Sequence, residues 1–198
     1  MRTIRTGTPG RERGAILIIA LMFLVLLTIV GVASISSTTL EEKMAGNMRE
    51  QVNAFQAAES ALRDAEIDLE TLIGGAGNRD AALGIGNGYF NTLCSAAFTN
   101  GVCRQPAVPA GTFQTEIVTA AGWDWASVTK TVGYGTFTGA SPFTGLFQQP
   151  RYVIEYLEEK NDATTTPTTR YFRVSARGWG ANANTAVTLQ TVYKMPLN

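Results

Sequence analysis

The chain has 198 residues, in which 16 Lys and Arg balance 16 Asp and Glu, with no histidine and two cysteines. A net charge of zero argues against non-specific nucleic-acid binding, which depends on an excess of basic side chains. The lack of histidine excludes Ser-His-Asp and Cys-His catalysis, His-ligated zinc and histidine pH switches.

The N-terminal region divides into a basic part and an apolar part. Residues 1–14 contain four arginines and one acidic side chain, and no charge occurs from Gly14 to Leu40. Within that run, the segment from Ala15 to Ile35 is almost wholly apolar and reaches the roughly 20 residues that cross a bilayer as a helix. Basic residues directly before an apolar span predict an N-terminus kept in the cytoplasm and a C-terminal part exported across the membrane.

Three processing outcomes are compatible with this pattern. The apolar segment could stay on an uncleaved chain as a signal anchor. A secretory signal peptide could be removed before Ser34, because Gly31-Val32-Ala33 supplies the small residues that such a site needs. The third outcome is cleavage between Gly14 and Ala15, which removes the basic leader and leaves the apolar helix on the mature protein.

A long amphipathic helix is predicted after the apolar run, because apolar side chains recur every three or four residues along one stripe. The stripe consists of Leu40, Met44, Met48, Val52, Phe55, Ala58, Leu62, Ala65, Leu69 and Leu72. Charged residues, Asp64 and Asp68 among them, are expected on the other faces. Thr39 and Glu42 could form a capping box that starts a second helix, but we favour one continuous helix over residues 15–73, ending before Gly74-Gly75.

The two halves of this stripe are expected to meet different neighbours. From residue 62 to residue 73 we expect packing against the chain's own C-terminal domain. The other half lies nearer to the membrane, and there we expect packing against helices of partner subunits. That partner-facing set is Met44, Met48, Val52 and Phe55.

Residues 74–150 are predicted to form a variable region of short strands and loops, because glycine, threonine and asparagine are frequent and charges are few. Cys94 and Cys103 lie in this region. In an oxidising compartment they are expected to form a disulfide worth roughly 2–3 kcal/mol for so short a loop. Metal binding is the alternative, but two thiols without histidine make a poor zinc site.

Residues 151–198 are predicted to form an antiparallel sheet. Polar and apolar side chains alternate in three segments, Tyr152–Glu158, Tyr171–Arg177 and Val187–Tyr193, with turn-rich connections between them. One face of such a sheet must be covered, and the helix stripe is the available cover. The predicted fold class is therefore α+β, a long N-terminal helix packed on a C-terminal antiparallel β-sheet.

Motifs for catalysis or phosphate binding are weak. The glycines of residues 84–88 lack the preceding strand and the Lys-Ser/Thr ending of a phosphate loop, so we favour a flexible loop. Ser141 has no neighbouring base and no nucleophile elbow around it. We therefore predict that the protein is not an enzyme and binds no cofactor.

Two further clusters have simple structural interpretations. Glu158, Glu159 and Asp162 lack the spacing of a calcium loop, and we favour a solvated hairpin tip over a metal site. Trp123 and Trp125 flank an acidic residue and could anchor a partner, although packing within the domain is the favoured interpretation.

Taken together, the basic leader ending in glycine, the apolar helix, its amphipathic continuation and the C-terminal sheet resemble type IV pilins. The stretches Thr38–Asn47 and Ala54–Arg63 are similar to the N-terminal region of the PilX family of minor pilins. Residues Tyr171–Gly178 and Val187–Tyr193 are similar to that family's closing strands. The resemblance is specific over about residues 13–68 and does not extend to the region between the helix and the closing strands.

This resemblance implies a set of maturation steps and partners. Prepilin peptidase would cleave after Gly14, and Ala15 would be N-methylated. The mature protein would assemble on an inner-membrane platform with other minor pilins and the major pilin, priming a pilus and sitting at its tip. That tip complex would carry a PilY-type adhesin, and the functions served would be adhesion, twitching motility or aggregation.

One position departs from the pattern of most pilins. They carry a glutamate at the fifth mature position, and its charge neutralises the N-terminal amine of a neighbouring subunit. In this chain the fifth mature position is Ile19. An unpaired buried amine is costly, so this departure favours a subunit at the tip, above which no further subunit lies.

Two other functions remain open from the sequence. The chain could be a minor pseudopilin of a type II secretion system, or a monomeric signal-anchored periplasmic binding protein whose ligand face is the variable region. In the favoured interpretation the protein spans the inner membrane once before assembly, with a periplasmic C-terminal domain, and reaches the cell surface at the pilus tip.

Overall fold

A computed structural model describes residues 13–73, 93–94, 101–106, 118, 123–160 and 169–196 of the chain. The leader residues 1–12, the glycine-rich segment 84–88, Asp162 and most of the region between residues 74 and 122 lie outside this description. The chain forms two compact units, Met1–Asn47 and Met48–Asn198, and each is described by itself.

The helix α1 spans Arg13–Ile73 without interruption. The prediction of one continuous helix is therefore confirmed, and the capping box at Thr39 starts no second helix. Interior proline is absent over the whole span, so nothing removes a backbone hydrogen bond or forces a kink. The helix ends at the residue before Gly74-Gly75, as expected where consecutive glycines follow.

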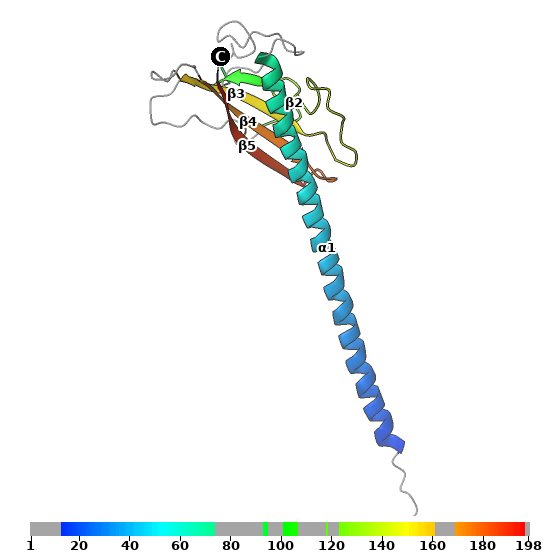
Figure 1. The fold of residues 1–198 in the computed structure, drawn as a ribbon. Coiled ribbons are helices and arrows are strands. Elements are labelled where there is room, and N and C mark those ends of the chain that lie inside the picture. Colours follow the sequence, from blue (N-terminus) through cyan, green and yellow to red (C-terminus); the bar gives the residue numbers. More distant parts are fainter. Residues whose placement is uncertain are drawn as a thin grey trace, which may run out of the picture. The chain divides into compact units, whose positions relative to one another are not determined.

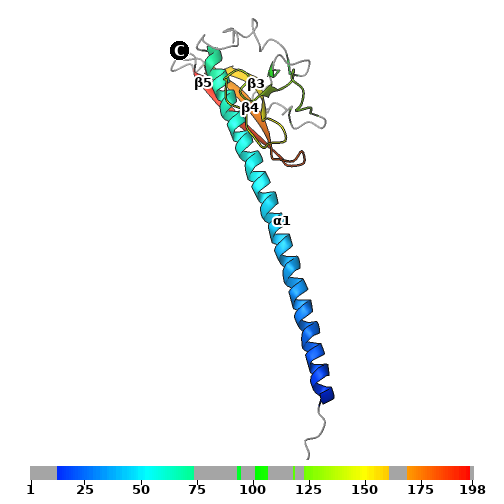
Figure 2. The same ribbon diagram turned by 90° about the vertical axis from the view of Figure 1, so that its right-hand side faces the viewer.

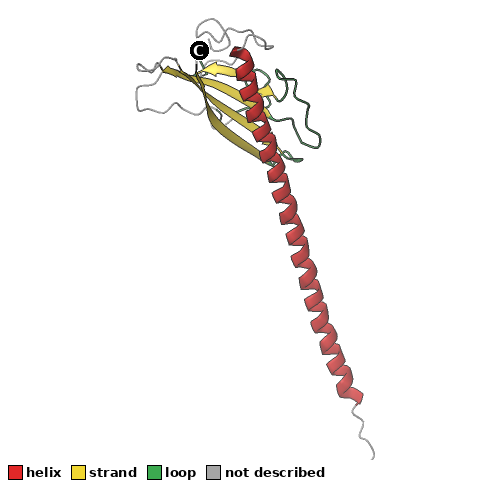
Figure 3. Cartoon of the chain, in the orientation of Figure 1, coloured by secondary structure: helices red, strands yellow, loops and turns green. Residues whose placement is uncertain are grey.

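The second unit is built on a mixed sheet (Figures 1 and 3). Its strands are β1 (Val102–Arg104), β2 (Val132–Gly133), β3 (Arg151–Lys160), β4 (Thr169–Trp179) and β5 (Ala186–Pro196). The strand order is β1-β3-β4-β5, with β2 also pairing with β3. The predicted antiparallel meander of the last three strands is confirmed. The sheet is not purely antiparallel, because β1 joins β3 in parallel, which a long connection between the two strands permits.

The C-terminal part of α1 covers one face of this sheet (Figure 2). Tyr152 and Ile154 on β3 and Phe172 on β4 are fully buried against it. The helix contributes Ala61, Ala65 and Leu69 to the same core. Apolar side chains at alternate strand positions thus face the helix, as the sequence predicts.

The helix face turned to the sheet differs from the predicted stripe. Ala58, Ala65 and Leu69 of that stripe are buried, but so are Asp64 and Asp68, whose expected place on a polar face is wrong. Among the helix residues whose burial is described, the other buried positions are Ala54, Ala57 and Ala61. The small alanine side chains let the helix backbone approach the sheet. A helix residue is therefore buried because it faces the sheet, and not because its side chain is large or apolar.

Helix and sheet approach each other closely at Gly178 on β4. A Cβ atom at this position would lie 2.3 Å from the carbonyl oxygen of Ala54 and 2.4 Å from the backbone nitrogen of Ala58. Such distances are far below van der Waals contact, so only glycine allows the helix to lie this near to the strand.

The second face of the sheet is also covered, which the sequence analysis did not anticipate. Trp125 and Trp179 pack with Val153 and Val118, and all four side chains are at most 6% exposed. Packing within the domain, the favoured interpretation of Trp125, is therefore confirmed, and Trp123 packs on the edge of the same cluster.

Candidate assembly surface

The helix in the first unit presents apolar side chains that are not buried by the chain itself. From Ile16 to Ile35, every large apolar side chain is between 47% and 70% exposed. An 18-residue window of this helix has a mean hydropathy of 3.2 and no part of it is buried. By length and composition the segment is able to cross a membrane, and its side chains are available to lipid or to other helices.

The predicted maturation residues lie at the start of α1. Gly14 and Ala15 are exposed, and a Cβ atom at Gly14 would meet nothing within 4 Å. Ile19, one turn further on, is 54% exposed. These three residues are therefore accessible.

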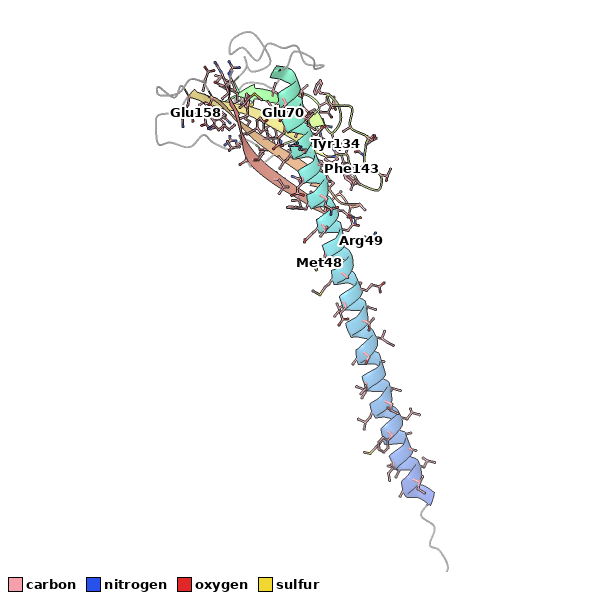
Figure 4. All side chains as sticks on the ribbon, viewed as in Figure 1. Met48, Arg49, Glu70, Tyr134, Phe143 and Glu158 are labelled. Atoms are coloured by element: carbon pink, nitrogen blue, oxygen red, sulfur yellow. A yellow bond between two sulfur atoms is a disulfide. The ribbon has the colours of Figure 1, made fainter. Side chains whose placement is uncertain are left out.

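In the second unit, an exposed apolar stripe continues along α1. Met48, Val52 and Phe55 are 66%, 50% and 43% exposed. Figure 4 labels Met48 and its neighbour Arg49 on this part of the helix. Met44, the remaining predicted partner-facing residue, belongs to the first unit and is 66% exposed. These four side chains are not buried by the chain itself, which leaves them available to partner helices.

Met48, Val52 and Phe55 form one wall of an open groove of about 560 Å³. The opposite wall comes from the turn before β5 and the start of that strand, residues 184–187. Polar helix residues Gln51, Gln56 and Glu59 border the groove. We call this site the α1–β5 groove. Its apolar wall and polar border are typical of a surface that receives another helix.

Acidic side chains of α1 hold this surface in place, a role that the sequence analysis missed. Asp68 accepts a hydrogen bond of 2.8 Å from the hydroxyl of Tyr152. Asp64 accepts one of 2.8 Å from the backbone nitrogen of Gly135 and another from the hydroxyl of Thr138. Because these bonds join the helix to a strand and to a loop, they determine how α1 is rotated and which side chains remain exposed.

Two further acids extend this attachment along the helix. Glu50 accepts a hydrogen bond from the backbone nitrogen of Ala181, in the turn between β4 and β5. Glu70, labelled in Figure 4, accepts one of 2.9 Å from the hydroxyl of Tyr193 on β5. Burial raises the pKa of the Tyr193 phenol above its usual 10.0, and the hydrogen bond to Glu70 raises it further. Asp64 and Asp68, four residues apart, lie on one face of the helix, and no other spacing among these acids distinguishes them in the sequence.

The predicted disulfide is present. Cys94 and Cys103 are joined with an S–S distance of 2.00 Å and are 5% and 0% exposed. Their sulfurs lie within 4.8 Å of a carboxylate oxygen of Glu155, a set that could suit a metal if the thiols were free. Because both sulfurs are consumed in the disulfide, the metal alternative does not apply to the oxidised protein.

Glu155 belongs to a buried polar cluster on the second face of the sheet. It forms an ion pair with Arg173, with 2.8 Å between Oε2 and Nε, and accepts a hydrogen bond from the side-chain amide of Gln105. Glu155 is 0% exposed and Arg173 is 6% exposed. A charge buried to this extent requires such pairing, so the cluster specifies how β1, β3 and β4 align.

Two residues of the acidic cluster at the end of β3, Glu158 and Glu159, have cationic partners. Glu158, labelled in Figure 4, pairs with Lys160 at 2.9 Å, and Glu159 pairs with Arg170 at 3.0 Å. The first pair lies within β3, and the second joins β3 to β4 where the two strands of the hairpin approach their connection.

Comparison with known families covers most of the chain. The model described as PilX N-terminal matches residues 13–63. The model described as Type IV pilus assembly protein PilX C-term matches residues 90–195. No curated protein and no solved structure matches the chain.

Proposed function

This chain belongs to the PilX family of type IV pilus minor pilins, and we propose that it acts at or near the pilus tip, priming assembly together with other minor pilins. Members of a structural pilin family interact with other pilus components. We further propose that the protein has no enzymatic activity and that its exported domain serves adhesion, twitching motility or aggregation.

The observation that carries the assembly role is the exposed stripe of Met48, Val52 and Phe55 beside the α1–β5 groove. Exposed apolar side chains at helical spacing are costly for an isolated soluble subunit and are stabilised when a partner helix covers them. We infer that helices of other minor pilins and of the major pilin pack here and along Met44. A PilY-type adhesin remains a further proposed partner of the tip complex.

Maturation is proposed to follow the pilin route. Prepilin peptidase would cleave between Gly14 and Ala15 and the new N-terminal amine of Ala15 would be methylated. Before assembly the protein would span the inner membrane with residues 15–35, its domain on the periplasmic side. The positively charged leader supports this orientation.

The tip position rests on Ile19. A subunit inside a shaft needs an acidic side chain to neutralise the buried N-terminal amine of its neighbour, because an unpaired buried charge costs several kcal/mol. Ile19 offers no charge, and a subunit with nothing above it has no such amine to neutralise. A shaft position would require this cost to be met by another group.

Substitutions in the exposed stripe test the assembly role directly. In cells that lack the native copy, Met48→Glu and Val52→Glu should reduce the number of surface pili, because they place a charge in an apolar helix contact. Arg49→Glu is the matched control, since Arg49 is exposed on the same turn but does not line the α1–β5 groove. Pilus counts by electron microscopy that fall equally for all three variants would contradict the proposal.

The mature N-terminus tests the maturation route. Mass spectrometry of the purified protein should find N-methyl-alanine at position 15. A chain beginning at Ser34 would point to ordinary secretion, and one beginning at Met1 to a signal anchor. For the tip claim, immunogold labelling should place the native protein at pilus ends and Ile19→Glu at additional positions along the shaft. Native protein at high copy number along the shaft would overturn it.

A further inference from the structure

Two arginines stand directly opposite each other on neighbouring strands of the sheet. Arg151, the first residue of β3, is the register partner of Arg177 on β4, so both side chains project from the same face. Like charges in such a pair repel each other unless an anion lies between or beside them. Elsewhere on these strands the arginines have acidic partners, because Arg173 binds Glu155 and Arg170 binds Glu159.

Neither Arg151 nor Arg177 forms an ion pair among the residues that the structure describes. The Nε atom of Arg177 is buried and has no hydrogen-bond partner there. Its guanidinium lies 5.5 Å from the centre of the Trp179 ring and is thus turned toward that side chain. Arg177 therefore adds positive potential to this part of the face, while Arg151 is the group that a ligand would contact.

The guanidinium of Arg151 is held in one orientation. Its Nε donates to the hydroxyl of Thr131, and its Nη2 donates to the Thr131 carbonyl oxygen at 3.0 Å. Thr131 is 1% exposed and is itself anchored, since its backbone nitrogen donates to the Ser127 carbonyl at 3.0 Å. An arginine that is oriented in advance loses little side-chain entropy when it binds an anion.

The remaining nitrogen, Nη1, faces space left by Gly133. A Cβ atom at Gly133 would lie 3.6 Å from Nη1 and 3.3 Å from the hydroxyl of Thr136. This space belongs to a pocket of about 210 Å³. The pocket is lined by Val128, Thr131, Val132, Gly133, Thr136, Phe137 and Arg151, and we call it the Arg151 pocket. It therefore has a cation, a hydroxyl and apolar walls.

We propose that the Arg151 pocket binds a carboxylate on a short apolar stem, the chemistry of a glutamate side chain presented by a partner protein. The guanidinium donates to the carboxylate, while Val128 and Phe137 contact the stem. Partial burial lowers the pKa of Arg151, chiefly through desolvation of the charged guanidinium, so contact with an anion favours the charged form.

The chemistry of the surroundings selects this class of ligand. The carboxylate of Asp124 acts on Arg151 through space, so it repels a phosphate dianion more strongly than the single charge of a carboxylate, and Arg151 is the one cation in the described lining of the pocket. A pocket of about 210 Å³ is also smaller than the roughly 300–1,000 Å³ typical of sites for whole small molecules. A single carboxylate side chain satisfies both the limit on charge and the limit on size. The proposal stands apart from the pilin function, because it is tested on the purified chain alone.

The test is a titration of the full chain in detergent micelles with two short peptides, followed by the nuclear magnetic resonance signal of the Arg151 Nε–H group. The signal is assigned with Arg151→Gln. Acetyl-Leu-Glu-amide should shift it and saturate, and acetyl-Leu-Gln-amide should bind about tenfold or more weakly, because it lacks the charge. Glucuronate and inorganic phosphate are the competing sources of negative charge.

Gly133→Ala keeps the hydrogen bonds of Arg151 but fills the space beside Nη1. It should weaken binding of the glutamate peptide about tenfold with little change in thermal unfolding. Arg170→Gln, which removes a sheet arginine outside the pocket, should leave binding unchanged. Equal binding of the glutamine peptide, full binding by Gly133→Ala, or tighter binding of glucuronate or phosphate would each overturn the proposal.

Discussion

The hydroxyl of Tyr152 on β3 donates a hydrogen bond of 2.8 Å to the carboxylate of Asp68 on α1, and both residues are almost fully buried. The two are 84 positions apart in the chain. This bond therefore joins the helix that carries the candidate assembly surface to the centre of the sheet.

Tyr152→Phe should lower the free energy of unfolding by about 1.5–3 kcal/mol, because it removes a donor from a buried carboxylate. Tyr193→Phe makes the same chemical change at the more exposed bond to Glu70 and should cost about 1 kcal/mol or less. Thermal unfolding in detergent, followed by circular dichroism, measures the difference. If both variants lost the same free energy of unfolding, the buried hydrogen bond would contribute no more to stability than the exposed one.

Gly178→Ala should destabilise the second unit by about 1–3 kcal/mol or more, since the new methyl group would overlap the backbone of Ala54 and Ala58. Gly46→Ala is the control, because a Cβ atom there meets nothing within 4 Å and alanine favours the helix by up to about 1 kcal/mol. Denaturant midpoints compare the two. A Gly178→Ala protein as stable as the native one would mean that the helix can move away from β4 at no cost.

Glu155→Gln should cost about 3–5 kcal/mol, because it leaves the buried Arg173 without its acidic partner. Glu159→Gln breaks the more exposed pair with Arg170 and should cost about 1 kcal/mol or less. The comparison is made by chemical denaturation at one pH. A loss at Glu155 no larger than that at Glu159 would contradict the assigned role of the buried pair.

Removal of the disulfide by the double change Cys94→Ala and Cys103→Ala should lower stability by about 2–3 kcal/mol, from the entropy of the open loop in the unfolded chain. In the folded native protein a reductant should release no thiol that a labelling reagent can detect, because both sulfurs are buried. Labelling should appear once denaturant is added. Rapid reduction without denaturant would show that this region opens locally.

Stability should fall as the pH rises above about 10, because the pKa of Tyr193 is raised in the folded state by burial and by its bond to Glu70. The unfolded chain then loses its proton first, so the contribution is complete below the unfolded pKa and disappears as the pH passes the folded one. Tyr193→Phe should flatten this alkaline decline. Unfolding midpoints measured over a series of alkaline pH values check the slope.

Local patterns predicted much of the fold. The uninterrupted helix follows from apolar periodicity and the lack of proline, and its end follows from Gly74-Gly75. Alternation in the segments around Tyr152, Phe172 and Leu189 was enough to locate the last three strands. These signals lie within a few residues of the structure they specify, and for that reason they can be read from the sequence.

Distant contacts could not be predicted in the same way. Asp64 and Asp68 look like ordinary surface acids until the loop at Gly135 and the hydroxyl of Tyr152 are brought to them. The Arg151 pocket likewise depends on register, because only pairing of β3 with β4 sets Arg151 opposite Arg177. The order of charged and apolar residues along the chain does not indicate which distant residues come into contact.

The burial of the Cys94–Cys103 disulfide also constrains the order of events as the domain matures. Cys103 lies within β1, where its register partner is Glu155 of β3, and it is 0% exposed. An oxidising enzyme works through a mixed disulfide and must reach one thiol directly. It can do so only while β1 is still separate from β3, so oxidation comes before this edge of the sheet closes. A chain that folds faster than it is oxidised would seal its thiols inside, and the rate of oxidant supply would then limit the yield of native subunits.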